Sequence, residues 1–384
     1  MSPSNTAAWL TAKGAKPLEV KPAPYTAPGP GEVVIHNGAV AINPVDWMKQ
    51  LMGDIMLGHI KYPFVPGCDV AGQVVEVGPG VDRLRVGDRV LANAVGGAPA
   101  ANRAAEGAFQ LYTVARQHLV SPIPDSISYE QACAIPLGLV TAAYGLFHQD
   151  FLGLDLPSVP ARENPIGRAV IVTGGSSSVG CNAVQLAAAA GYDVYTTCSA
   201  KNFDYAKRLG AKHVFDYHNT GWTAEMVEAL RGKPVMGAYA IGDGSVEGCA
   251  EVLRRLAKQR NNGGEVNKFV AFAGFPTPAE RRLKSTFGSA ALVVSIVGWM
   301  IGTAIRSQIA GVKAKFIDQK DLCQVSENNV IVKVYRDFLP QALEAKQFVP
   351  APEPLVVGKG LDKIQEAFET HAKGVSAQKV VVAL

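Results

Sequence analysis

A glycine- and serine-rich loop near the middle of the chain has the composition needed to bind a phosphate group. Residues 174–180 read GGSSSVG; they follow the β-branched stretch 169–172 and precede the alanine-rich stretch 181–190. Small residues let backbone N–H groups and a helix N-terminus approach a pyrophosphate closely. Glycine-serine turns are common, but a strand before the loop and a helix after it are the context that a dinucleotide site requires. The sequence therefore predicts the first unit of a dinucleotide-binding fold, in which the loop residues that contact the cofactor are Gly175, Ser176, Ser177, Ser178 and Val179.

The residues after the second predicted strand indicate which dinucleotide binds. An NAD-selective site places an acidic residue there, about 20 residues past the loop, where it binds the ribose 2′-hydroxyl. Here the strand 193–198 is followed by Ser199, Lys201 and Asn202, with no carboxylate among them. A hydroxyl, an ammonium and an amide suit a 2′-phosphate, which a carboxylate would repel, so we expect NADPH. The alternative is that Ser199 caps a helix and Lys201 is only solvated.

Composition places the chain among α/β proteins with a large core. It has 384 residues, 48% of them hydrophobic and 18% charged, with a net charge of +4, which indicates two domains. No basic cluster is present, so we expect no nucleic-acid partner. The six cysteines are scattered without a C-x-x-C pair, which argues against zinc fingers, redox pairs and disulfides and favours a reducing compartment. Because the N-terminus has neither a basic flank nor an apolar core, we expect no signal peptide and a cytoplasmic location.

One apolar segment, 285–305, contains no charged residue, and its length would admit a membrane helix. It lies between two strand-like runs, 268–272 and 313–317, that belong to one predicted sheet. A membrane-spanning helix would separate these strands, so we expect no transmembrane span. The segment is interpreted as an apolar wall of a substrate pocket or as a subunit interface. We expect the protein to be a monomer or a homodimer. Interfacial membrane attachment stays open.

The two parts of the chain differ in their predicted elements. The first ~130 residues carry short strands between Pro/Gly turns, which is typical of a β-rich barrel. Helical pattern follows at 129–147, then a proline-containing loop at 155–167, then alternating strands and helices to about residue 347. The tail from 354 to 384 reads strand, helix, strand. Strands are predicted at 32–36, 70–77, 89–91, 111–114, 193–198, 213–215, 355–357 and 379–384. Helices are also predicted at 202–209 and 361–371.

These boundaries predict an α/β protein with a nucleotide domain inserted into a β-rich domain. The β-rich, barrel-like domain would comprise residues 1–132 and 348–384. The Rossmann-type domain, a doubly wound parallel sheet that binds NADP(H), would comprise residues 133–347. We expect the cleft between two such domains to hold the ligand.

Several short motifs occur in one order along the chain, and together they carry a resemblance. The motifs are 43–47 (NPVDW), 66–74 (PGCDVAGQV), 86–90 (VGDRV), 107–112 (GAFQLY), 356–360 (VVGKG) and 373–381 (KGVSAQKVV). Over essentially its whole length the chain resembles the medium-chain dehydrogenase/reductase superfamily, whose first domain is a GroES-like barrel. Within it, the chain is most similar to the zinc-free quinone oxidoreductases and enoyl reductases, including the trans-acting enoyl reductases of fungal polyketide pathways.

The residues at the zinc positions of this superfamily differ from those of its zinc alcohol dehydrogenases. The Gly-His-Glu motif of those enzymes is here Gly67-Cys68-Asp69, and the first cysteine position, near 43–46, has no thiol. Cys133 is the cysteine nearest the second position, and the four-cysteine structural lobe is missing. A catalytic zinc needs three protein ligands, so we expect no metal and interpret Cys68 as a buried apolar side chain.

Without a metal, reduction of a C=C bond conjugated to a carbonyl is the best-supported chemistry. Hydride from the nicotinamide adds at the β-carbon, and the protein positions the acceptor and donates hydrogen bonds to the enolate oxygen. The resemblance implies an NADPH-dependent oxidoreductase of fungal secondary metabolism acting on an enoyl, enone or quinone group. The substrate would be a small molecule or be bound to a carrier, with the carrier or synthase on another protein. The alternatives are a zinc-independent alcohol dehydrogenase or carbonyl reductase, and a non-catalytic NADPH-binding protein.

Three residues are candidates for catalysis. Thr141 matches the threonine that the trans-acting enoyl reductases place near nicotinamide and substrate; the alternative is a helix-interior threonine bonded to its own backbone. Related enzymes often carry Asp-x-Lys after the position of Asp46, whereas this chain has its lysine one residue later, at Lys49. Tyr62, with His59 nearby, is a further proton-donor candidate, although a packed turn would also explain Tyr62. The resemblance also implies cofactor contacts at Pro44, Asp46, Tyr217, Ile241, Val356, Val357 and Lys379.

Overall fold

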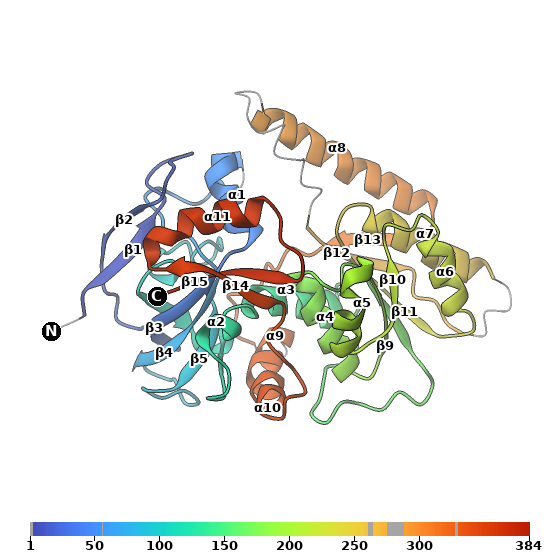
Figure 1. The fold of residues 1–384 in the computed structure, drawn as a ribbon, viewed down its shortest axis with the longest axis horizontal. Helices are drawn as coiled ribbons and strands as arrows, with labels where there is room; N and C mark the ends of the chain where they lie inside the picture. The colour runs from blue at the N-terminus through green and yellow to red at the C-terminus, as the bar shows by residue number, and fades with distance from the viewer. Residues whose placement is uncertain (1–2, 56, 260–263, 275–287, 327–328) are drawn as a thin grey trace. The chain divides into compact units, whose positions relative to one another are not determined.

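The computed structural model describes residues 3–55, 57–259, 264–274, 288–326 and 329–384, and it divides into two compact units. The first unit comprises residues 1–140 and 320–384, and the second comprises residues 141–319 (Figure 1). The segments 133–140 and 320–347, expected in the nucleotide domain, belong to the first unit. Side chains explain this placement, because the Tyr335 hydroxyl donates to the Pro136 carbonyl at 3.1 Å and His118 Nε2 lies 3.1 Å from the Leu322 carbonyl oxygen.

The first unit is built on a seven-stranded sheet in the order β14-β15-β3-β4-β5-β7, with β6 paired to β3. All its neighbours are antiparallel except β14 and β15, which are parallel. The sheet strands are β3 (Glu32–Ala41), β4 (Asp69–Val77), β5 (Arg89–Asn93), β6 (Tyr112–Arg116), β7 (Val120–Pro122), β14 (Glu353–Lys359) and β15 (Gln378–Ala383). A separate antiparallel pair, which the sequence pattern missed, is formed by β1 (Asn5–Trp9) and β2 (Glu19–Ala23).

The helices of the first unit depart from the sequence expectation in two places. An unpredicted helix, α1 (Pro44–Met52), begins after Asn43, whose backbone N–H donates to the Asp46 carboxylate at 2.8 Å. The expected helical stretch 129–147 is two helices, α2 (Tyr129–Ala132) and α3 (Pro136–Phe147), because Pro136 has no N–H with which to continue the first. The remaining helices are α9 (Val330–Lys333), the π-helical turn Val334–Phe338, α10 (Leu339–Glu344) and α11 (Ile364–Ala372).

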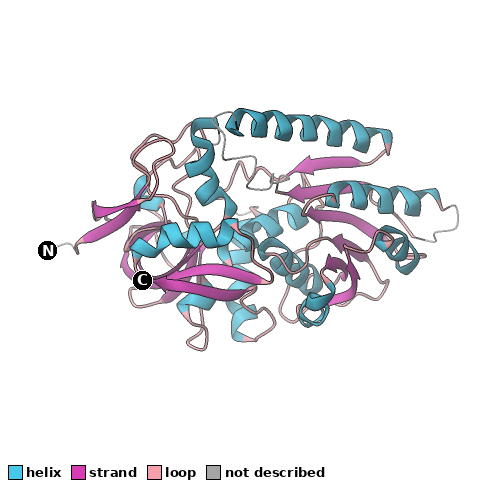
Figure 2. Cartoon of the chain, turned by 45° about the horizontal axis from the view of Figure 1, so that its top comes forward, coloured by secondary structure: helices cyan, strands magenta, loops and turns pink. Residues whose placement is uncertain are grey.

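The second unit is a six-stranded, all-parallel sheet in the order β10-β9-β8-β11-β12-β13. This is the strand order of a Rossmann fold, so the expected fold class is confirmed; Figure 2 shows these strands side by side with helices next to them. The strands are β8 (Ala169–Val172), β9 (Asp193–Cys198), β10 (Ala211–Asp216), β11 (Val235–Ile241), β12 (Phe269–Ala273) and β13 (Lys313–Phe316). Every residue of β8 is buried, as expected for a strand covered on both faces.

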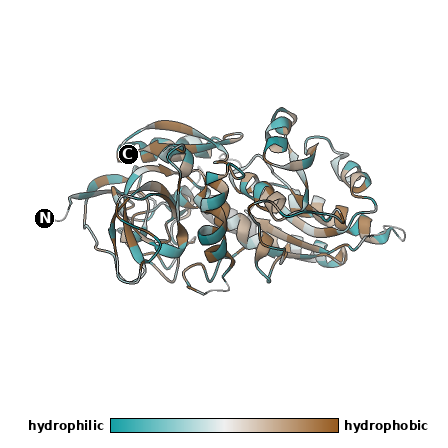
Figure 3. Cartoon of the chain, turned by 90° about the horizontal axis from the view of Figure 1, so that it is seen from below, coloured by the Kyte–Doolittle hydropathy of each residue, from teal (hydrophilic) through white to brown (hydrophobic). Residues whose placement is uncertain are grey.

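Helices alternate with the strands of this sheet. They are α4 (Ser178–Ala189), α5 (Phe203–Arg208), α6 (Trp222–Ala229), α7 (Ser245–Lys258) and α8 (Gly288–Ile309). Figure 3 shows alternating hydrophobic and hydrophilic bands on the helices of the chain, the pattern of helices with one buried face.

The apolar segment forms α8, apart from residues 285–287, which lie outside the described residues. Its Trp299 ring packs edge-on against Phe272 of β12 at 5.7 Å, and its Arg306 pairs with Glu247 of α7 at 2.8 Å. Val294 of the same helix is 72% exposed. Within the described residues, no helix combines the length and apolarity that crossing a bilayer requires.

Candidate functional site

The glycine-serine loop lies between β8 and α4 in a conformation that only small residues allow. Gly174 has a φ of +65°, in the left-handed region that favours glycine. A Cβ on Gly175 would lie 2.2 Å from Thr196 Oγ1, and one on Gly180 would lie 2.0 Å from the Gly174 carbonyl oxygen. The backbone is therefore packed tightly against β9. The Ser177 hydroxyl accepts from the Gly180 N–H at 3.1 Å and caps α4, so the loop leads directly to a helix N-terminus suited to phosphate.

A group of polar side chains, here called the β9 cluster, lies beside the loop. It consists of Ser176, Ser199, Asn202 and Tyr217. Asn202 Nδ2 donates to Ser176 Oγ at 3.2 Å, and the Ser199 and Tyr217 hydroxyl oxygens lie 3.1 Å apart. Lys201, in the short 3₁₀ helix Ala200–Asn202 that follows β9, is exposed. The cluster offers hydroxyl and amide groups next to a cation, which is the donor set that a 2′-phosphate needs.

A carboxylate that the sequence reasoning missed stands one strand away. Asp216 ends β10 and lies opposite Cys198 of β9 in the register. Its Oδ1 accepts from the His218 backbone N–H at 3.0 Å and lies 2.8 Å from His218 Nδ1. These two contacts, the backbone one first, lower the pKa of Asp216. The sequence reasoning examined only the end of β9, and matching the carboxyl ends of neighbouring parallel strands would have found this residue.

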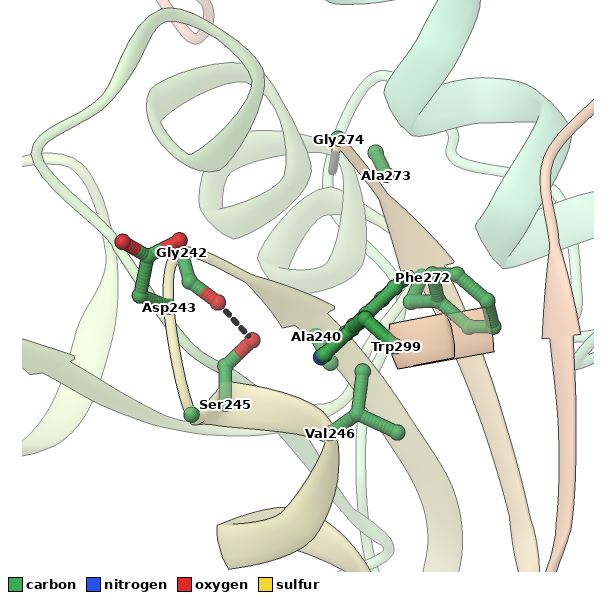
Figure 4. Close-up of a pocket in the computed structure, with 10 residues that line it drawn as sticks. Ala240, Gly242, Asp243, Ser245, Val246, Phe272, Ala273, Gly274 and Trp299 are labelled. Carbon is green, nitrogen blue, oxygen red and sulfur yellow. Dashed lines mark hydrogen bonds between the residues drawn. The ribbon is translucent and has the colours of Figure 1, made fainter. Parts of the chain in front are cut away.

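A pocket opens at the carboxyl ends of β11 and β12, with about 310 Å³ of empty space, part of it continuous with solvent. Figure 4 shows the Trp299 and Phe272 rings beside one another on one side and the Gly242–Ser245 turn on the other. The residues lining it are Ala240, Gly242, Asp243, Gly244, Ser245, Val246, Phe272, Ala273, Gly274 and Trp299. The carboxyl edge of an open parallel sheet is where ligands of this architecture bind. Ile241, an expected cofactor contact, ends β11 beside the loop, and its backbone N–H donates to Thr173 Oγ1 at 2.8 Å.

Thr141, the first catalytic candidate, lies on α3 where the second unit begins, because residues 136–140 of this helix belong to the first unit and residues 141–147 to the second. Its Oγ1 accepts a hydrogen bond from Gln319 Nε2 at 2.8 Å, and its backbone carbonyl accepts one from the Tyr239 hydroxyl at 2.9 Å. Tyr239 lies in the middle of β11, so α3 is joined to the strand at whose end the pocket opens. The sequence did not indicate that Gln319 contacts Thr141, because 178 positions separate them.

Lys49 and Tyr62, the other two catalytic candidates, lie together in the first unit. The Lys49 ammonium is 2% exposed and donates to the Gly53 carbonyl at 3.2 Å and the Leu57 carbonyl at 3.0 Å. It also lies 3.4 Å from an Asp54 carboxylate oxygen and 4.9 Å from the centre of the Tyr62 ring. Lys49 thus holds the loop that follows its own helix. The Tyr62 hydroxyl is buried and has no hydrogen-bond partner among the described residues.

Two expected cofactor contacts, Asp46 and Lys379, lie in a buried polar cluster of the first unit. This cluster consists of Asn43, Asp46, Asp69 and Lys379, which are buried, and of Cys68, which was expected to be buried and is partly exposed. Lys379 Nζ lies 2.6 Å from Asn43 Oδ1 and 2.8 Å from an Asp69 carboxylate oxygen. Asn43 Nδ2 donates to the same Asp69 oxygen at 2.8 Å. These bonds connect the last strand of the chain, β15, to the starts of α1 and β4.

Electrostatics in this cluster follow from burial. Asp69 is fully buried, and its second oxygen accepts from the Leu137 N–H at the start of α3 at 2.7 Å. Burial, followed by the neighbouring Asp69 carboxylate, raises the pKa of Asp46 to about 7, against the opposing effect of the Asn43 N–H. Burial and both carboxylates also raise the pKa of the Cys68 thiol well above its usual value.

The remaining predicted residues lie at the surface or in other positions of the first unit. Pro44 is exposed at the first turn of α1, and Val356 of β14 is 47% exposed with Val357 half-buried beside it. In the part of the chain that the structure describes, no three His, Cys, Asp or Glu side chains come together as a metal site would require.

Comparison with known proteins identifies the family. Residues 29–125 match the family model "Alcohol dehydrogenase GroES-like domain", and residues 178–259 match "Zinc-binding dehydrogenase". The chain is 49% identical over 382 residues to the dehydrogenase pigH of Monascus ruber, with 100% of both chains covered. The chain belongs to the medium-chain dehydrogenase/reductase superfamily. It falls in the fungal branch that includes enoyl reductases, because it is also 33% identical to the trans-enoyl reductase himH of Aspergillus japonicus, covering 98% of this chain and 97% of that one.

A solved structure of this superfamily shows the same fold. The mycobacterial protein Rv1454c, complexed with NADPH, has a TM-score of 0.65 and 23% identity, and the match covers 99% of this chain and 100% of that one. The family models and the full-length relatives confirm the resemblance drawn from the sequence motifs. The "Zinc-binding dehydrogenase" match lies in the second unit, whereas Cys68 and Asp69, at the zinc-ligand position of the superfamily, lie in the first.

Proposed function

We propose that this member of the medium-chain dehydrogenase/reductase superfamily is an NADPH-dependent, zinc-independent enoyl reductase of fungal secondary metabolism. NADPH would supply the hydride that adds to the β-carbon of an enoyl, enone or quinone group. The observation that carries the proposal is the loop and the β9 cluster beside it, where glycine geometry, a helix N-terminus and polar donors occur together. The trans-enoyl reductase name of himH supports the reaction class.

The residues proposed to hold the cofactor are those of the second unit. The loop and the start of α4 would bind the pyrophosphate, as helix N-termini bind anions. Ser199, Lys201 and Asn202 would bind the 2′-phosphate, with Tyr217 beside the adenosine. The Asp216 carboxylate, one strand away, accepts two hydrogen bonds from His218, and these bonds compete with a cofactor ribose for its oxygens.

The acceptor would bind near the nicotinamide end of the cofactor. We propose that the pocket beyond β11 and β12, with Trp299 as an apolar wall, takes part in selecting it. The Thr141 hydroxyl would donate to the substrate carbonyl oxygen, where negative charge develops as hydride arrives. A proton for the α-carbon then comes from water or a side chain.

Zinc independence is supported by what surrounds Asp69. A catalytic zinc requires three protein ligands and an open fourth position. Here the Asp69 carboxylate already binds the Lys379 ammonium, the Asn43 amide and a backbone N–H. An internal cation therefore occupies the oxygens that a metal would need.

Turnover assays separate the proposal from its alternatives. The purified protein should consume NADPH with α,β-unsaturated ketones, enoyl thioesters or quinones, and 4-deuterated NADPH should deliver deuterium to the β-carbon of the enone product. Consumption with aldehydes alone would make it a carbonyl reductase, and tight NADPH binding without turnover on any acceptor would make it a binding protein. Elemental analysis and chelator treatment test the metal: stoichiometric zinc with chelator-sensitive activity would refute zinc independence.

A further inference from the structure

A hydrogen bond within the second unit joins the two positions where the chain enters and leaves it. Thr141 and Gln319 are the first and last residues of that unit. The Gln319 amide donates to Thr141 Oγ1 at 2.8 Å across 178 positions of sequence. Gln319 follows β13 on the carboxyl side of the parallel sheet, which is the side where this architecture binds its ligands.

Packing around this bond holds α3 in a fixed position against the sheet. The Tyr239 hydroxyl of β11 donates to the Thr141 carbonyl at 2.9 Å. One turn later, a Cβ on Gly145 would lie 2.2 Å from the Tyr239 ring and 2.6 Å from Ile317 Cδ1. Because residues four apart lie on one helix face, Thr141 and Gly145 both face the strands and the segment after β13. Only a glycine allows this approach, so the position of Thr141 is set by backbone contact.

Gln319 adopts a backbone conformation that its residue type disfavours. Its φ is +45°, in the left-handed region that residues with a Cβ rarely enter. Such strain persists where the surrounding structure requires it, and it concentrates at functional sites. A glycine would relieve the strain at this turn but would have no side chain to reach Thr141. The structure therefore keeps a strained residue whose side chain makes one specific contact.

We propose that Gln319 is a positioning residue for Thr141: its amide orients the Thr141 hydroxyl and polarises the O–H bond that donates to the substrate carbonyl. This inference rests on the proposed function, in which Thr141 is the group that touches the acceptor. A hydroxyl that accepts a hydrogen bond becomes a stronger donor, because hydrogen bonds in a chain polarise one another. Gln319 itself acts only through Thr141.

The first test removes the amide and keeps the side-chain length. Gln319→Met should lower kcat for an enone about 10-fold, the upper end of what one net hydrogen bond contributes. The KM for NADPH should stay unchanged, because the loop and the β9 cluster are untouched, and the melting temperature should stay within a few degrees. Gln341→Met is the matched control, since Gln341 is an exposed glutamine on α10, and it should leave kcat unchanged.

The second test is a double-mutant cycle. If Gln319 acts through Thr141, then Gln319→Met should cost less than about 2-fold in a Thr141→Val background, because the group it orients is already gone. Independent, multiplicative losses would mean that Gln319 serves only the fold and would overturn the inference. A Thr141→Ser background, which keeps the hydroxyl, should restore the full effect of Gln319→Met.

The third test checks the direction of the hydrogen bond. Gln319→Glu keeps the shape but turns the donor into an acceptor at neutral pH. It would draw the Thr141 proton away from the substrate, so kcat should fall at least as far as in Gln319→Met. Full activity would show that Thr141 donates to Gln319. That result would contradict the role given to Gln319 and would leave the proposed function intact. An inactive wild-type protein with every acceptor would instead overturn the proposed function together with the inference.

Discussion

The lysine of the buried polar cluster in the first unit and the lysine beside the β9 cluster in the second unit carry the same charge at opposite exposure. Lys379 is 3% exposed and makes its bonds to Asn43 and Asp69, whereas Lys201 is exposed beside Ser199 and Asn202. A buried ammonium must be paired within the protein, and its partners then link strands and helix starts. The N–H groups of an exposed ammonium are accessible to a ligand. Burial therefore separates the lysine that links elements of the fold from the lysine proposed to bind the cofactor.

The largest expected effect is a loss of stability when the buried polar cluster of the first unit is disrupted. Lys379→Met leaves the Asp69 carboxylate buried without its cation, and removing one partner of a buried pair costs about 3–5 kcal/mol. The free energy of unfolding, measured in urea, should fall by that amount, whereas the matched variant Lys201→Met should change it by less than about 0.5 kcal/mol. Adding Asp69→Asn to Lys379→Met should recover part of the loss. Equal effects of the two lysine substitutions would remove the distinction between the clusters.

The next effect concerns catalysis. Thr141→Val should slow enone reduction about 10- to 1,000-fold, the range for removing one donor to a developing oxyanion. Lys49→Met should slow it less, because the Lys49 ammonium is already bound to the Gly53 and Leu57 carbonyls of its own loop. Single-turnover kinetics with saturating NADPH measure both. If Lys49→Met abolished turnover while folding and NADPH affinity stayed intact, a lysine donor would replace Thr141 in the mechanism.

Charge at the β9 cluster should set the cofactor preference. Ser199→Asp should weaken NADPH binding about 10- to 100-fold, the worth of a charge-assisted hydrogen bond, and should leave NADH binding nearly unchanged. Titration of both cofactors by fluorescence tests this, with Asp204→Asn on exposed α5 as a control. Asp216→Asn removes the nearby carboxylate and should shift the preference further toward NADPH. Equal losses for both cofactors in Ser199→Asp would contradict the assignment.

The last prediction is a pH dependence of stability that arises within the buried cluster. The Asp46 pKa is raised to about 7 in the folded protein, against about 3.9 in the unfolded chain, so the folded state holds a proton that the unfolded state has lost. The stability that this group contributes is present below pH 4, decreases by up to about 1.4 kcal/mol per pH unit as pH rises, and levels off above 7. Asp69, Lys379 and Cys68 surround the group. Asp46→Asn should flatten this part of the stability profile, and an unchanged profile would place the titration elsewhere.

The sequence by itself determined the nucleotide fold and predicted a cofactor-binding loop within it. A β-branched run, a small-residue loop and an alanine-rich stretch occur within 22 consecutive residues, 169–190, so local spacing was enough to identify the unit. The fold class, with its doubly wound parallel sheet, and the superfamily followed from such local patterns. Helix α1 was missed because its cap, Asn43 with Asp46, lies inside a motif that was interpreted for chemistry alone. The single helix expected at 129–147 is interrupted at Pro136, a breaker visible in the sequence.

Only the tertiary structure decided which polar residues have partners inside the protein. The hydrogen bond between Lys379 and Asn43 joins residues 336 positions apart, and the one between Gln319 and Thr141 joins residues 178 positions apart. No local period relates such positions, so the sequence could not show that Lys379 neutralises Asp69 or that Gln319 reaches Thr141. Asp216 is a different case, because it directly follows the predicted strand 213–215, and aligning the carboxyl ends of neighbouring parallel strands places it beside the end of β9. Local patterns specify which elements form, whereas the pairing of buried charges and donors depends on the packing of distant segments.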